Sequence, residues 1–176
     1  WLDRLNMFTD PANIEALKIV PLFLDFNSDQ LKKISEISDV IELDPGDTPI
    51  LEGAQLDYLY VLMDGEIKVE VYIPTQGELE TARLGPLDIL GWSSMTPVVR
   101  QRTGTTTALT HCKLIRIQGK KLFKLCEEDH DIGFFIYRRI ANVAARSWLT
   151  TRLQFMNIII EENKNNNSHH HGGSGS

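Results

Sequence analysis

The sequence predicts a mainly β fold, a double-stranded β-helix or jelly roll, with helices before it and one long helix after it. Between Val40 and Ile117, apolar residues recur at alternate positions or in short runs separated by turn signals, which is the pattern of many short strands. On both sides of this region the apolar spacing changes to three and four residues, the period of a helix. A chain of 176 residues with 42% hydrophobic residues is long enough to bury one core.

The first part of the chain, residues 1–20, is predicted to hold an N-terminal helix. Asp10 is a good helix cap, and Pro11 suits the first helical position because its missing N–H has no partner there anyway. A second short helix follows, with Asn27 or Ser28 as its cap.

Residues 21–128 are predicted to form the β domain with short flanking helices. The run Tyr58–Met63 is continuously apolar, which indicates a strand that is buried on both faces. Ile67–Val71 alternates apolar and polar residues and indicates a half-buried strand. Turn signals separate these runs at short intervals, as a jelly roll requires: Asp44-Pro45-Gly46-Asp47, Glu52-Gly53, Asp64-Gly65, Thr75-Gln76-Gly77 and Gly85-Pro86.

Residues 129–162 are predicted to form the long C-terminal helix, with Asp129 or Asp131 as its cap. Apolar residues continue at spacings of three and four through most of this segment. Ser147 and Thr150 interrupt the apolar seam, which weakens the case for a continuous coiled coil.

Composition and charge exclude several classes of protein. A net charge of −6 argues against binding nucleic acid or an anionic membrane surface by charge alone. The longest apolar stretches are too short to span a bilayer. Cys112 and Cys126 form no CxxC pair and no disulfide framework, so we expect two buried thiols and a cytoplasmic location. Residues 163–176, rich in Asn and then in His, Gly and Ser, are expected to be a flexible tail or tag.

Two segments could suggest catalysis or metal binding, but neither supports it. Gly91–Met95 lacks the final glycine of the Gly-x-Ser-x-Gly nucleophile elbow, and the α/β pattern around that elbow is missing. The acidic residues within Cys126–Asp131 are better explained by helix capping and the helix dipole. We therefore expect no enzyme activity, no metal site and no cofactor.

The spacing of the turn glycines carries a family resemblance. Gly46-Asp47 is followed by Glu52-Gly53, then by the strand Asp57–Leu62, and then by Gly65. Each glycine permits a turn conformation that a Cβ would forbid. In this order and register, residues 21–160 resemble the cyclic-nucleotide-binding domain of the catabolite-activator and protein-kinase regulatory families. The resemblance implies a jelly-roll domain that senses a small ligand.

The resemblance also implies that residues 85–104 form a phosphate-binding cassette. In that family a short helix offers its N-terminal backbone N–H groups to the cyclic phosphate, and an Arg pairs with the same phosphate. The expected ligand-binding residues are those that match the cassette: Gly91, Trp92, Ser93, Ser94, Arg102 and Thr103. Gly91-Trp92-Ser93 and Cys126–His130 resemble a bacterial subgroup of the family. We expect this protein to have no helix-turn-helix domain and no direct contact with DNA.

Trp92 departs from the family pattern, because it occupies the place of an acidic residue that binds the ribose 2′-hydroxyl. A hydrogen bond to a charged group contributes about 1.5–3 kcal/mol, so its loss should weaken the binding of cAMP about ten- to a hundredfold. The indole could stack on a base, fill the ribose pocket, or close a degenerate pocket as a core aromatic. The sequence leaves these alternatives open.

Together these features predict a non-catalytic regulatory module that binds a cyclic nucleotide, cAMP or cGMP, or a related anionic small molecule. The C-terminal helix would relay binding to an unknown protein effector and could form a homodimer. The alternative is a degenerate domain with a structural or protein-interaction role, for example an insert in a larger protein such as an encapsulin-type shell. A third hypothesis is a regulator that acts on DNA through a partner chain.

Overall fold

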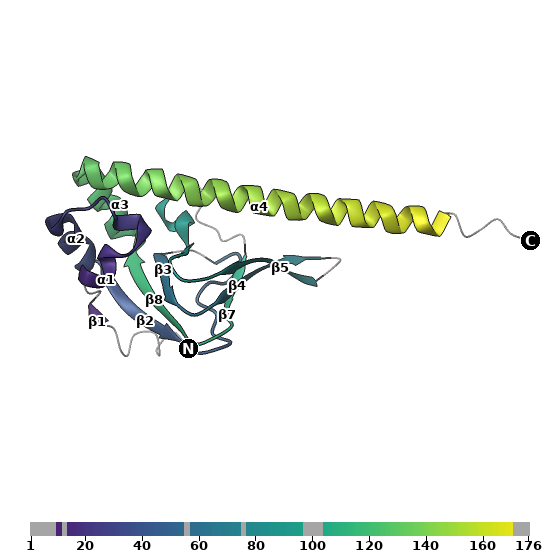
Figure 1. Ribbon diagram of the computed structural model, residues 1–176, viewed down its shortest axis with the longest axis horizontal. Helices are drawn as coiled ribbons and strands as arrows, with labels where there is room; N and C mark the ends of the chain where they lie inside the picture. The colour runs from purple at the N-terminus through teal and green to yellow at the C-terminus, as the bar shows by residue number, and fades with distance from the viewer. Residues whose placement is uncertain (1–9, 12–13, 55–56, 75–76, 97–103, 171–176) are drawn as a thin grey trace, which may run out of the picture.

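The structure is a computed structural model that describes residues 10–11, 14–54, 57–74, 77–96 and 104–170. Two antiparallel sheets pack face to face, with helices gathered over the outer face of the larger one (Figure 1). Among the described residues the larger sheet has the strand order β1-β2-β8-β3-β6 and the smaller one β5-β4-β7. The strands are β1 (Asp10–Pro11), β2 (Ser38–Leu43), β3 (Tyr58–Asp64), β4 (Ile67–Ile73), β5 (Gly77–Leu84), β6 (Ile89–Leu90), β7 (Thr105–Ala108) and β8 (Cys112–Gln118). The predicted mainly β fold with flanking helices is confirmed.

Most helices come before or after the main run of strands, β2 to β8, in the chain. The helices before it are α1 (Ile14–Lys18), the 3-10 helix η2 (Pro21–Phe23) and α2 (Ser28–Ser35). The 3-10 helix η3 (Trp92–Met95) lies between β6 and β7, and α3 (Gly119–Glu128) and α4 (His130–His170) follow β8. Asn27 caps α2 through a capping box. Its Oδ1 accepts from the Gln30 N–H at 2.9 Å, and the Gln30 Oε1 accepts from the Asn27 N–H at 3.1 Å.

The position of strand β3 explains why its sequence is apolar without alternation. Side chains of a strand point to opposite faces in turn. Leu59 and Val61 pack into the core between the larger sheet and the helices, while Tyr60 and Leu62 pack into the core between the two sheets. Both faces of β3 are therefore buried, as its continuous apolar run predicted.

One prediction at the N-terminus is wrong. Asp10 and Pro11 were expected to start a helix, but they form the edge strand β1, with Asp10 opposite Val40 and Pro11 opposite Asp39 of β2. An edge strand tolerates proline because one of its sides needs no ladder hydrogen bond. Helix α1 begins later, at Ile14.

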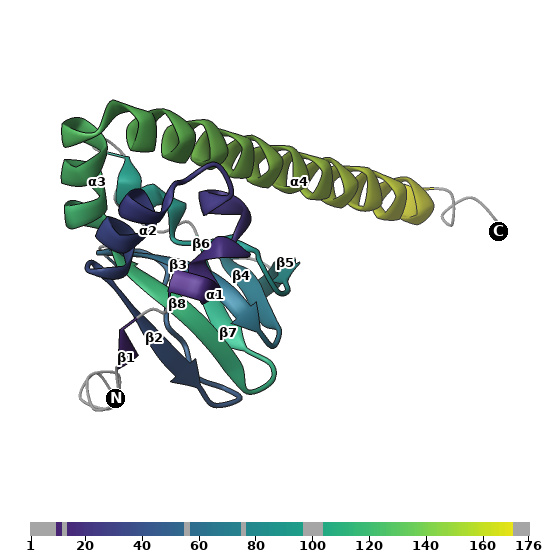
Figure 2. The ribbon, with the colours of Figure 1, turned by 60° about the vertical axis from the view of Figure 1, so that its left-hand side comes forward.

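Helix α4 runs as one long rod over the molecule and projects beyond the sheets, as two views show (Figures 1 and 2). Asp129 caps it, because its Oδ1 accepts from the Ile132 N–H at 3.2 Å. The helix continues to His170, so residues 163–170 are helical and the expected flexible tail is wrong for that stretch. No helix within the described residues is both long and apolar enough to cross a membrane.

Candidate binding cavity

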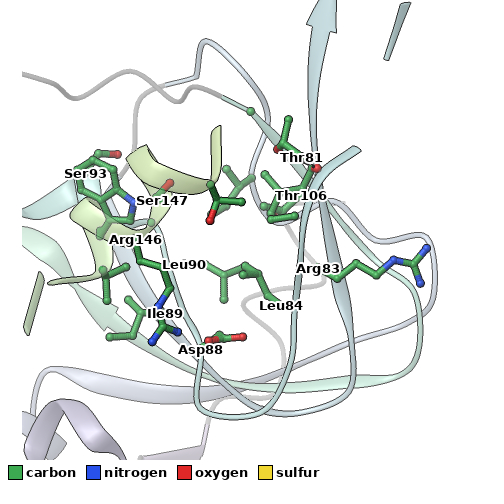
Figure 3. Close-up of a pocket in the computed structure, with 18 of the residues that line it drawn as sticks. Thr81, Arg83, Leu84, Asp88, Ile89, Leu90, Ser93, Thr106, Arg146 and Ser147 are labelled. Atoms are coloured by element: carbon green, nitrogen blue, oxygen red, sulfur yellow. Dashed lines mark hydrogen bonds between the residues drawn. The ribbon is translucent and has the colours of Figure 1, made fainter. Parts of the chain in front are cut away.

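A cavity of about 860 Å³ lies between the smaller sheet, the β6–η3 segment and α4 (Figure 3). Its walls on the sheet side are largely apolar, with Val69, Val71 and Leu84 from β4 and β5 and Leu90 from β6. Pockets for small ligands in proteins measure roughly 300–1,000 Å³ and combine apolar walls with a few polar groups. The size and the walls of this cavity suit one small organic ligand with an apolar part.

The segment that begins η3 forms one end of the cavity. Gly91 has a φ of 72°, in the left-handed region that favours glycine, and it turns the chain from β6 into η3. Gly91, Trp92 and Ser93, three of the six residues predicted to bind the ligand, line the cavity. Ser94 does not line it. Ser94 packs instead against Gly119 at the start of α3.

The backbone of η3 also differs from the expected phosphate-binding helix. Its Ser94 N–H donates to the Gly91 carbonyl at 3.0 Å, and the Thr96 N–H donates to the Ser93 carbonyl at 3.1 Å. The Ser94 N–H is therefore already used within the turn. A 3-10 turn of four residues also sums few peptide dipoles, so its field on an anion is weaker than that of a full helix.

Trp92 is partly buried, lines the cavity and packs against the helix-side core. The indole thus belongs both to the wall of the cavity and to the edge of the core. Both positions are compatible with the three alternatives that the sequence left open for this residue: stacking on a base, filling the ribose position, or closing a degenerate pocket as a core aromatic.

Helix α4 covers the cavity with one continuous face. The lining residues on α4 follow one another at alternating steps of three and one, so that the same side of the helix is repeated every four residues. They are Arg139, Asn142, Val143, Arg146, Ser147, Thr150, Thr151 and Gln154. Ser147 and Thr150, which interrupt the apolar seam in the sequence, thus belong to a polar stripe that faces the cavity. The sequence analysis missed this stripe: its positions repeat at the helical period, but the sequence does not show that this side of α4 faces a cavity.

The arginines around the cavity differ in where they point. Arg83 points away, and its guanidinium is engaged by Glu80 at 2.7 Å and Glu66 at 3.3 Å (Figure 3). Arg146 reaches from α4 toward the wall that carries Asp88 (Figure 3). The Arg139 Nη2 donates to the Asp25 Oδ2 at 2.6 Å, so the Asp25 carboxylate partly neutralises the positive charge of Arg139.

Buried polar atoms without a hydrogen-bond partner gather at this cavity. Such atoms are rare in folded proteins, because leaving them unpaired is unfavourable. Among the described residues, only the Ser94 Oγ, Thr106 Oγ1, Arg139 Nε and Gln154 Oε1 are of this kind. Three of these four belong to residues that line the cavity. These three atoms are left to pair with water or with polar groups of a ligand.

Two predicted site residues, Arg102 and Thr103, lie outside the described residues. The described chain resumes at Gly104, which lines the cavity. A Cβ at Gly104 would lie 2.8 Å from the Glu70 carbonyl oxygen of β4, so only glycine fits this close approach.

Other clusters of reactive side chains do not form a site in the described part of the chain. No group of three or more His, Cys, Asp and Glu residues there could hold a metal ion. Cys112 and Cys126 are both buried. Burial raises the pKa of the Cys126 thiol to about 12, with further contributions from Asp129 and Glu127, so this thiol stays protonated at neutral pH.

Comparisons with known proteins agree with this architecture. The family model for the cyclic nucleotide-binding domain matches residues 40–129, about half of the chain. A search of the curated proteins found no match. A cyclic nucleotide-binding domain from Methylobacillus flagellatus has a similar fold, with a TM-score of 0.69 and 20% identity over 81% of this chain and 80% of that one.

Two further solved structures are similar. The N-terminal domain of a transcriptional regulator from Streptomyces coelicolor has a TM-score of 0.61 and 27% identity, over 75% of this chain and 94% of that one. The regulatory subunit of a cAMP-independent protein kinase A from Trypanosoma brucei has a TM-score of 0.63 and 17% identity, over 84% of this chain and 50% of that one. On the family match and the shared fold, the chain belongs to the cyclic nucleotide-binding domain family.

Proposed function

We propose that this protein is a non-catalytic regulatory module that binds a cyclic mononucleotide in the cavity and relays binding through α4. The observation that carries the proposal is the open cavity of about 860 Å³ beside Trp92, into which the polar stripe of α4 faces. A degenerate domain would not need to keep such a cavity. In such a domain, the buried polar atoms without partners would lower the stability of the fold, and no bound ligand would compensate for the loss.

The lining chemistry suits a cyclic nucleotide. Apolar walls can hold a base, and Arg146 supplies positive charge from α4. The family resemblance implies that Arg102 and Thr103 hold the cyclic phosphate, next to Gly91 and Ser93. The described lining contains one carboxylate, Asp88, and no His, Cys, Glu or Lys, so it offers no nucleophile with a neighbouring base. Binding without catalysis is the role that this chemistry supports.

The relay follows from the position of α4. Helix α4 packs on α3 and through Ile132, Ile136 and Ile140 into the helix-side core, and it also forms the roof of the cavity. A ligand that contacts both the sheet and α4 would favour the position of the helix seen here over one in which it lies farther from the sheet. A ligand shifts such an equilibrium only by its difference in affinity for the two positions.

The same helix carries a surface for a partner. On the sides that do not line the cavity, α4 exposes large apolar side chains, with exposed fractions of 70% for Trp148, 54% for Leu149, 53% for Leu153 and 47% for Met156. Leu149, Leu153 and Met156 repeat at spacings of four and three, the seam of a two-helix contact. We propose a second copy of this chain as the partner. Light scattering should give twice the monomer mass, and Leu153→Glu should restore the monomer; a monomeric native chain at high concentration would contradict the dimer.

Isothermal titration of the full chain with cAMP and with cGMP tests the binding proposal. Arg146→Ala is expected to weaken binding of the nucleotide that binds better about tenfold, because it removes a charge-assisted contact between the guanidinium and the nucleotide. Arg83→Ala is the matched control, since this arginine points away from the cavity and should leave binding unchanged. Equal effects of the two substitutions, or no heat with either nucleotide, would refute this placement of the ligand.

The interaction-domain alternative is favoured by one observation, the replacement of the expected acidic residue by Trp92. If neither nucleotide binds while the chain still dimerises through α4, the domain acts as a scaffold. That outcome would transfer the functional role from the cavity to the exposed face of α4.

A further inference from the structure

The turn between β5 and β6 holds a leucine in a backbone conformation that suits glycine. Among the described residues, Leu87 is the only residue other than glycine with a positive φ, which is 73°. In this left-handed region the Cβ of an L-residue comes too close to its own backbone, so glycine or asparagine is the usual choice. Leu87 therefore places strain on the fold.

Hydrogen bonds on both sides of Leu87 hold the turn in this shape. The Asp88 N–H donates to the Gly85 carbonyl at 3.1 Å and closes a four-residue turn. Pro86 and Leu87 are its central residues, and the positive φ at the second of them is that of a type II turn. The Leu87 N–H donates to the Leu62 carbonyl of β3 at 2.6 Å, and the Leu62 N–H donates to the Asp88 carbonyl at 3.0 Å. Because the turn is fastened to a buried strand, it cannot relax to relieve the strain.

The Leu87 side chain does not offset this strain by packing in a core. It is 38% exposed and belongs to neither of the two core clusters. It lines the cavity instead, together with Pro86 and Asp88 of the same turn and Ile89 of β6. Arg146 of α4 reaches toward the wall that carries this turn (Figure 3). Strained residues that the surrounding structure holds in place are typical of ligand-binding positions.

We propose that Leu87 is a ligand-contacting residue, whose side chain packs on an apolar face of the nucleotide bound in the cavity. The inference rests on the proposed function and adds a residue that sets its affinity. A ligand would cover the exposed part of this side chain, and burial of apolar surface favours binding. An apolar contact has no preferred hydrogen-bond partner, so Leu87 should strengthen the binding of cAMP and of cGMP by similar factors.

Two substitutions at this position separate the contact from the strain. In isothermal titration of the full chain, Leu87→Ala and Leu87→Gly should each weaken every nucleotide that binds about tenfold, since both remove the apolar contact. Leu87→Gly should melt about 2–4 °C above Leu87→Ala, because glycine accepts the positive φ and alanine does not. It should also melt no lower than the native chain. A residue that only supports the fold could not give a variant that is as stable as the native chain and yet binds less tightly.

Two controls and the contrary outcomes complete the test. Leu87→Met keeps a large apolar side chain and should bind like the native chain. Leu51 is 55% exposed and does not line the cavity, so Leu51→Ala should leave the affinity unchanged. If Leu87→Ala and Leu87→Gly bind as tightly as the native chain, the contact is refuted and the proposed function stands. A Leu87→Gly variant that melts below Leu87→Ala would overturn the strain argument. If neither nucleotide binds the native chain, the proposed function fails, and this contact with it.

Discussion

Replacing Trp92 by the acidic residue that its family position implies should change folding and binding in opposite directions. A Trp side chain buries about 150–250 Å² when enclosed. At ~25 cal/mol per Å², removing this partly buried indole from the helix-side core would cost about 3 kcal/mol of folding free energy. For a chain of this size Trp92→Glu should lower the melting temperature by about 6–12 °C.

Binding should respond in the other direction. A carboxylate at position 92 can accept a charge-assisted hydrogen bond from a ribose hydroxyl, which contributes about 1.5–3 kcal/mol. The affinity of Trp92→Glu for cAMP should rise about ten- to a hundredfold. The gain should disappear with 2′-deoxy-cAMP, whereas the native chain should bind cAMP and its deoxy form about equally.

The control is Trp92→Gln, which should lower the melting temperature similarly but raise the affinity much less, because it lacks the charge. Titration calorimetry and thermal unfolding of the three chains give both quantities. A native chain that strongly prefers cAMP over 2′-deoxy-cAMP would refute the reasoning. So would a Trp92→Glu variant that gains nothing from the 2′-hydroxyl.

Three further predictions concern the stability of the fold and the reactivity of a buried thiol. Asp129→Ala should lower the free energy of unfolding by about 1 kcal/mol at pH 7, because it removes the cap of α4. The Ile132 N–H holds the pKa of this carboxyl below its ordinary value. The cap therefore stabilises the fold above the unfolded pKa and is lost as the pH falls through the lower folded pKa. Urea unfolding should show the difference between the two chains shrink as the solution is acidified, and a difference that does not depend on pH would contradict this role. The Cys126 thiol, with its pKa raised to about 12, should resist a thiol reagent at pH 8 until urea unfolds the chain, and rapid native labelling would contradict its burial. Gly104→Ala should destabilise by roughly 1–3 kcal/mol, since its Cβ would crowd the Glu70 carbonyl; an unchanged melting temperature would show that the strand can move aside.

Local sequence patterns correctly predicted the elements that are determined by neighbouring residues in the chain. The cap at Asn27 is made within one helical turn, and the apolar run of β3 reports burial on two faces directly. Asp10-Pro11 misled for the same reason. Its local preference for a helix start is real, but pairing with β2 is a long-range contact that no local pattern contains.

The site was harder to predict because it is assembled from distant segments. The cassette could be placed from its own residues, and Gly91 and Ser93 do line the cavity. Gln154 could not be found in this way, since it lines the cavity while its amide donates to the Thr81 carbonyl at a bulge in β5, far away in sequence. Ser147 and Thr150 were read as flaws in an apolar seam, because the sequence does not show which side of α4 faces a cavity.

Thermal unfolding of the full chain, with millimolar cAMP, with millimolar cGMP and with buffer alone, tests the central claim most directly. A ligand at one hundred times its dissociation constant stabilises the folded state by about 2.7 kcal/mol. For this chain that corresponds to a rise of roughly 5–10 °C in the melting temperature. The account predicts such a rise with one of the two nucleotides and its loss in Arg102→Ala. No shift with either nucleotide, or an equal shift in Arg102→Ala, would contradict it.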